Sequence, residues 1–102
     1  MEKIARLAGM IREEIEDARR YALCALKAKG SNAAEARAFS EMAGQELGHA
    51  DKLHALAVAC IEEAKRSGRE APAGMERVWE FEHDRMVEDA AAVRGLLSSL
   101  SG

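Results

Sequence analysis

The amino-acid sequence predicts an all-α protein, because apolar residues recur at intervals of three, four or seven along almost its whole length. Its 102 residues are 48% hydrophobic and 32% charged with a single proline, a balance typical of amphipathic helices and not of a disordered chain. No segment shows the alternation of apolar and polar residues that marks a strand. We expect one helical domain over residues 1–102, with a modest core.

The first two helices are expected over residues 3–29 and 33–66. The first carries the apolar stripe Ile4, Leu7, Ile11, Ala18, Tyr21 and Ala25. Gly30 follows two lysines and is a common stop signal, and Ser31 and Asn32 then offer an N-cap for the second helix. Because this connection is so short, the two helices must form an antiparallel hairpin. A third helix is expected over residues 75–100, after a connection over residues 67–74 that holds the only proline.

Charge and cysteine usage exclude several classes of protein. The formal net charge is −3 and basic residues are interleaved with acidic ones, so we expect no nucleic-acid partner. No run of about 18 apolar residues predicts a membrane span, and the first residues lack the apolar block of a signal peptide, so we expect a cytoplasmic protein. Cys24 and Cys60 are far apart in the sequence, and we expect both to be buried as small hydrophobic residues. Because there is no Cys-x-x-Cys pair, a zinc ribbon and a rubredoxin-type iron site are excluded.

Five polar residues occupy or adjoin the apolar stripes where hydrophobic residues are expected. They are Glu14 on the first helix, Glu46 and His49 on the second, and Glu80 and His83 on the third. A buried ionised carboxylate costs several kcal/mol unless it is paired or bound to a metal. A set of buried salt bridges, made for example by Arg12 or Arg85, is one explanation, and a shared metal site is the other.

The spacing favours a metal site. Glu46-x-x-His49 and Glu80-x-x-His83 are the same i, i+3 pair, whose side chains are neighbours on a helix. Four-helix di-iron proteins use a glutamate from each of two helices and a Glu-x-x-His pair from each of the other two. Glu14 lies sixteen residues before Gly30 and Glu46 fifteen after Ser31, so the two carboxylates lie within about one helical rise of ~1.5 Å of the same level.

These residues resemble the iron site of ferritins and rubrerythrins. The resemblance rests on Glu14, on Tyr21 seven residues later, and on Glu46-x-x-His49-Ala in the next helix, while residues 79–83 resemble the last Glu-x-x-His helix of rubrerythrins. It implies a ferritin-like bundle with Glu14 and His49 as terminal ligands and Glu46 as a bridging ligand. It implies similar ligand roles for Glu80 and His83. It implies iron as the bound metal, with manganese or zinc as substitutes. It also implies that Tyr21 is a hydrogen-bond partner of one of the ligands.

The chain departs from full-length members of that family in two ways. It lacks a fourth helix with its ligand glutamate, and it lacks a rubredoxin-like module. It is similar in length to the encapsulated ferritins, which complete their site by dimerisation, so the resemblance implies a homodimer or a higher homo-oligomer, with a shell or an electron-donor protein as a further partner. Glu82 and Asp84 are the nearest candidates within the chain for the missing carboxylate, and His54 falls at the edge of the stripe.

The placement of the third helix is left open by the sequence. If that helix simply folds back along the second, Glu80 misses the level of Glu46 by about twelve residues, or ~18 Å. Either the connection runs back along the second helix, or Glu80 and His83 meet the hairpin of another subunit.

The expected function is oxidation of Fe(II) by dioxygen or peroxide at a di-iron centre, in iron handling or protection from oxidative stress, which would make the protein a ferroxidase or peroxidase-type enzyme. Two alternatives stay open. One is a helical oligomerisation or adaptor protein that keeps the scaffold without the metal, and the other is a sensor or carrier that binds metal without turning it over.

Overall fold

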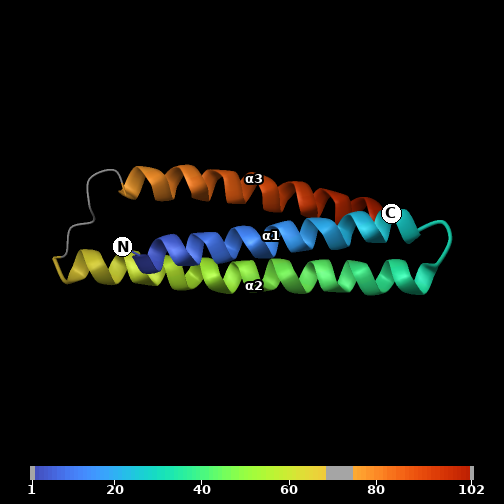
Figure 1. The fold of residues 1–102 in the computed structure, drawn as a ribbon, viewed down its shortest axis with the longest axis horizontal. Coiled ribbons are helices and arrows are strands. Elements are labelled where there is room, and N and C mark those ends of the chain that lie inside the picture. Colours follow the sequence, from blue (N-terminus) through green and yellow to red (C-terminus); the bar gives the residue numbers. More distant parts are fainter. Residues whose placement is uncertain (1, 69–74, 102) are drawn as a thin grey trace.

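The computed structural model describes the backbone of residues 2–68 and 75–101, and the side chains of residues 2–68 and 79–100. Three long helices follow one another: α1 (Glu2–Ala28), α2 (Ala33–Arg66) and α3 (Met75–Ser101). They lie side by side in a bundle of 56 × 19 × 18 Å, with α1 and α3 running in one direction and α2 in the other (Figure 1). The all-α prediction is confirmed, and the predicted bounds differ from the observed ones by one residue at most.

The predicted turn between α1 and α2 is present. Asn32 is the N-cap of α2, and its side chain accepts a hydrogen bond of 3.0 Å from the backbone N–H of Glu35. The backbone N–H of Asn32 donates to the carbonyl of Ala28, at 2.8 Å, which closes the end of α1. α1 and α2 therefore form the expected antiparallel hairpin. At the other end of α2, Gly68 has φ 73°, a left-handed conformation that favours glycine, and residues 69–74 of the predicted connection lie outside the described residues.

The interface between α1 and α2 is built largely from alanines. Ala18, Ala22 and Ala43 are completely buried, and small side chains of this kind allow two helix backbones to approach closely. Larger residues complete the core on either side of them. The buried cluster consists of Ile11, Ile15, Ala18, Ala22, Ala43, Leu47, Ala50, Met86, Ala90 and Val93.

α3 packs mainly against α1 and barely against α2. Arg12 on α1 donates a hydrogen bond of 2.9 Å to Glu82 on α3, and Lys29 donates one of 3.2 Å to the carbonyl of Ser99. On the side of α2, the described polar contact with α3 is the ion pair between Asp51 and Arg94, at 3.6 Å. This arrangement leaves a groove between α2 and α3 that α1 closes from behind.

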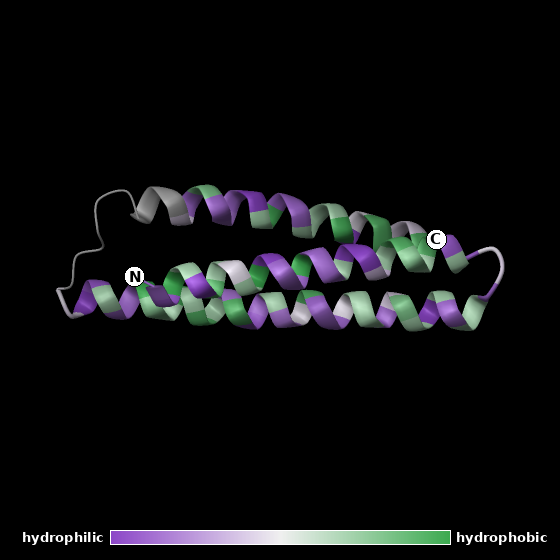
Figure 2. Ribbon diagram, in the orientation of Figure 1, coloured by the Kyte–Doolittle hydropathy of each residue, from purple (hydrophilic) through white to green (hydrophobic). Residues whose placement is uncertain are grey.

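Apolar and polar residues are interspersed along all three helices, and no helix is apolar over its whole length (Figure 2). None of the described helices has an apolar segment long enough to cross a bilayer.

Candidate metal centre

Glu14, Glu46 and His49 converge at the middle of the α1–α2 hairpin. The Nδ1 atom of His49 lies 3.6 Å from Oε2 of Glu14 and 3.8 Å from Oε1 of Glu46. One potential ligand atom from each of the three side chains lies within 4.8 Å of the others. Among the described residues, this is the only group of three or more histidine, cysteine or acidic side chains with that property. The structure thus brings together three of the five residues that the sequence singles out.

The alanine interface explains why these three side chains meet. Ala18 follows Glu14 by one helical turn, Ala43 precedes Glu46 by nearly one turn, and both are completely buried between the helices. Because the two backbones lie close together there, short carboxylate side chains can reach across the interface. The equal level of Glu14 and Glu46, predicted by counting from the turn, agrees with the contact that both make with His49.

The three groups are only partly enclosed. The side chains of Glu14 and Glu46 are 27% and 21% exposed, whereas that of His49 is 54% exposed. The Oε2 atom of Glu14 is nevertheless buried and has no hydrogen-bond partner among the described residues. A buried carboxylate oxygen without a donor is costly, and a cation would satisfy it. The donor set therefore fits a metal ion, through two carboxylates and one imidazole.

The electrostatics of the pair point in the same direction. The pKa of Glu46 is raised above its ordinary value, first by a hydrogen bond with the Glu14 carboxyl, then by burial, and then by the negative charge of Glu14. The nearby His49 acts in the opposite sense. Two neighbouring carboxylates repel each other when both are charged, and a bound cation would cancel that repulsion.

The three residues lie on the face of the hairpin that α3 does not cover. On α1, Arg12 contacts α3 and lies two residues before Glu14, which turns the two side chains ~200° apart around the helix. On α2, Asp51 contacts α3 and lies two residues after His49, so these two side chains also point ~200° apart around their helix. We call the side that carries Glu14, Glu46 and His49 the open face.

Apolar side chains flank Glu14, Glu46 and His49 on this open face. Met10 and Met42 precede Glu14 and Glu46 by four residues each, and so lie one turn away on the same side of their helices. They are 43% and 37% exposed. Leu56, seven residues after His49, is 57% exposed and lies on the same side of α2. The three polar side chains thus lie within a partly apolar surface that the described part of the chain leaves exposed.

Tyr21 stacks on Phe39 across the hairpin, with ring centroids 6.2 Å apart. Its position two turns from Glu14 places it on the open face. In the part of the chain that the structure describes, no hydrogen bond from its hydroxyl to a ligand carboxylate is present, so its role beside a ligand stays a prediction.

Glu80 and His83 do not join the other three residues within one chain. The ring of His83 lies against that of His54, with centroids 4.8 Å apart, and Glu80 is exposed. His54 is eight residues beyond Glu46, and Glu80 lies three residues before His83, so Glu80 lies about eleven residues, or ~16 Å, from the level of Glu46. The third helix therefore follows the simple fold-back geometry and also lies on the opposite face.

The other residues that the sequence offered as ligands or as ion-pair partners have different neighbours. Glu82, a candidate for the missing carboxylate, is paired with Arg12, and Asp84 is largely exposed beside His83. Arg85 lies over the ring of Phe81, at 5.9 Å from its centroid. Neither Arg12 nor Arg85 pairs with Glu14 or Glu46 among the described ion pairs. Salt bridges to these arginines therefore do not explain why Glu14 and Glu46 occupy the apolar stripes.

Comparisons with protein-family models, with curated proteins and with solved structures find no match to this chain. The assignment of a function therefore depends on the geometry of this chain's own residues.

Proposed function

We propose that this chain is a ferritin-like, non-haem iron protein whose metal centre is held by Glu14, Glu46 and His49 and is completed by a second copy of the chain. The observation that carries the proposal is the convergence of these three side chains on a face that α3 leaves open. Oxygen and imidazole donors without a thiolate suit iron or manganese, and the excess of carboxylate favours iron.

The number of ligands supports a second copy as the missing half. A four-helix di-iron centre takes one glutamate from each of two helices and a Glu-x-x-His pair from each of the other two. One copy of this chain supplies Glu14 from α1 and Glu46-x-x-His49 from α2, which is half of that set. Two copies related by a two-fold axis supply four glutamates and two histidines. A dimer thus accounts for the missing carboxylate without Glu80 or His83.

The surface around the ligands supports the same occupant. Met10, Met42 and Leu56 surround the ligands with exposed apolar side chains, and α3 does not obstruct them because it packs on the other side of the hairpin. A two-fold contact through this face would bury the apolar side chains of both copies and enclose the polar centre between them. Excluding water there would strengthen every charge interaction within the centre.

In the metal-free protein, Glu46 would bind a proton more readily than an ordinary glutamate. The pKa of Glu46 is raised, first by its hydrogen bond with Glu14 and then by burial. A bound cation would displace that proton, so metal affinity should rise with pH. His49 would present an imidazole nitrogen beside both carboxylates. Two bound Fe(II) ions would each give one electron, which together would reduce dioxygen to peroxide or peroxide to water.

Anaerobic titration with Fe(II) tests the ligands. The wild-type protein should bind iron, and Glu46→Ala and His49→Ala should each lose most of it. Glu41→Ala is the matched control, because Glu41 is an exposed acid on the same helix, and it should bind iron like the wild type. Equal iron content in the wild type and in both ligand variants would overturn the site. Wild-type protein that assembles but takes up no iron would favour the adaptor alternative instead.

Sedimentation equilibrium with and without Fe(II) tests the second copy. We expect iron to bind only to a dimer or to a larger even oligomer. Stoichiometric iron on a protein that remains a monomer at micromolar concentration would overturn the shared centre, while leaving Glu14, Glu46 and His49 as ligands.

A further inference from the structure

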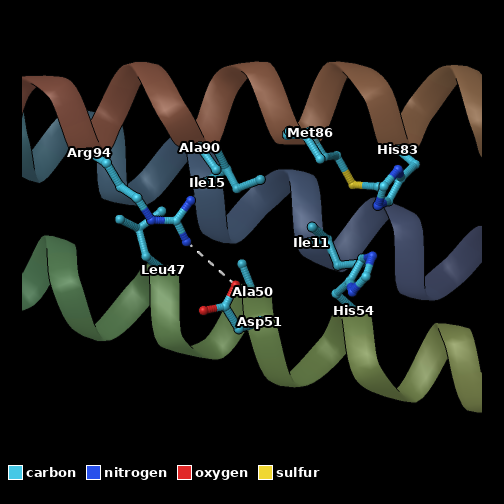
Figure 3. Close-up of a pocket in the computed structure, with 11 residues that line it drawn as sticks. Ile11, Ile15, Leu47, Ala50, Asp51, His54, His83, Met86, Ala90 and Arg94 are labelled. Carbon is cyan, nitrogen blue, oxygen red and sulfur yellow. Dashed lines mark ion pairs between the residues drawn. The ribbon is translucent and has the colours of Figure 1, made fainter.

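We propose that His54 and His83 form a second metal site, distinct from the open face, that binds one late first-row divalent cation such as Cu²⁺, Ni²⁺ or Zn²⁺ between α2 and α3. These are two of the three histidines in the chain, and their rings come from different helices and lie beside each other, with centroids 4.8 Å apart and planes tilted by 33° (Figure 3).

The ring separation fits a shared ion. A metal holds an imidazole nitrogen at ~2.0–2.1 Å, so two imidazoles on adjacent positions of one ion place their ring centroids roughly 4.5–5 Å apart. The observed 4.8 Å lies in that range. Among the described residues, His54 forms no ion pair, and His83 forms only a long one, with its Nδ1 4.0 Å from Oδ1 of Asp84.

The surroundings make the site accessible. Both histidines line a groove of about 160 Å³ between α2 and α3, with Met86 of α3 beside His83 and Ile11 of α1 near His54 (Figure 3). The side chain of His83 is 35% exposed, so water can complete the coordination of an ion held there. The carboxylate of Asp51 in the same groove is paired with Arg94 and is therefore not the expected third ligand.

The chemistry of the pair separates this site from the proposed iron centre. Two imidazoles without a carboxylate prefer the metals at the end of the first-row series, and Cu²⁺ is the strongest binder among them. An ion here would also join α2 to α3, which otherwise hardly contact each other. The site therefore couples metal binding to the attachment of α3, and does not depend on the open face.

Trp79 provides a direct readout, because it is the only tryptophan and its ring lies 6.1 Å from that of His54 and 5.9 Å from that of His83. Bound Cu²⁺ should quench its fluorescence. The experiment uses untagged full-length protein that carries Glu46→Ala and His49→Ala, so that the open face contributes no ligand pair. We expect quenching that saturates at one Cu²⁺ per chain, and copper electron paramagnetic resonance that shows two imidazole nitrogens.

Variants of each histidine complete the test. His54→Gln and His83→Gln should each weaken Cu²⁺ binding at least ~10-fold, with unchanged circular dichroism and an unchanged Trp79 emission maximum before metal is added. His54→Phe, which keeps an aromatic ring beside Trp79, is the second variant if glutamine disturbs the packing. Quenching without saturation, copper spectra without two nitrogens, or equal affinity after loss of either histidine would overturn the second site.

Discussion

Replacing Ala18 with leucine tests the idea that the alanine-rich interface between α1 and α2 brings together the residues of the proposed metal centre. Ala18 is completely buried between α1 and α2, one turn from Glu14. A leucine there adds three carbon atoms where no solvent-accessible space is left. The two helices must then separate or the new side chain must adopt a strained rotamer.

The expected cost follows from that geometry. Overpacking a filled core costs about 1–3 kcal/mol, and in a domain of this size each kcal/mol lowers the melting temperature by roughly 4–8 °C. Ala18→Leu should therefore lower the melting temperature of the metal-free protein by roughly 4–24 °C. It should also weaken Fe(II) binding, because the carboxylate of Glu14 moves away from Glu46 and His49.

Thermal melting followed by circular dichroism, and anaerobic Fe(II) titration, measure the two effects. Ala59→Leu is the matched control, since Ala59 is exposed on α2, and it should change neither quantity appreciably. If Ala18→Leu melts like the wild type and binds iron equally well, close approach of the helices is not what assembles the site.

Three further predictions address charge and assembly. Because the pKa of Glu46 is raised in the folded state, protonation of this side chain stabilises the fold. This contribution to the free energy of unfolding is fully present below pH 4.5, the ordinary pKa of a glutamate, and is lost as the pH rises through the pKa of Glu46 in the folded protein. Glu46→Gln should therefore raise the melting temperature of the metal-free protein at pH 7, with the difference shrinking below pH 4.5, and a variant that melts lower at pH 7 would contradict this. Met42→Glu places a charge on the open face and should shift sedimentation toward monomer, whereas Glu41→Ala should not. Arg12→Ala removes an exposed ion pair with Glu82 and should cost no more than about 1 kcal/mol in urea unfolding; a larger loss would show that this pair is needed to hold α3 in place.

Much of the fold could be predicted from the sequence because its signals are local. Gly30 and Asn32 mark the end of one helix and the start of the next, and the hairpin follows from the shortness of the turn. Counting residues from that turn was then enough to bring Glu14 level with Glu46. The function and the ferritin-like classification depend on metal and assembly, and these stay predictions.

The position of α3 could not be predicted in the same way. Its attachment depends on contacts between residues far apart in the sequence, such as the packing of Met86 and Ala90 in one buried cluster with Ile11 and Ile15, and no local signal encodes them. The repeated Glu-x-x-His motif suggested that His83 shares a site with His49. The structure places His83 beside His54 instead, because helical periodicity gives the face of each helix but not which neighbour covers that face.

The central position of α1 has a consequence for how the chain can tolerate substitution. Of the buried hydrophobic residues in the described part of the chain, nine belong to α1, four to α2 and three to α3. α1 packs on α2 and on α3 from different sides, and its remaining side carries Glu14 and Met10. A saturation mutagenesis screen should therefore find α1 the least permissive helix. α3, which packs mainly on α1 and only slightly on α2, should accept the widest range of residues on its outer surface.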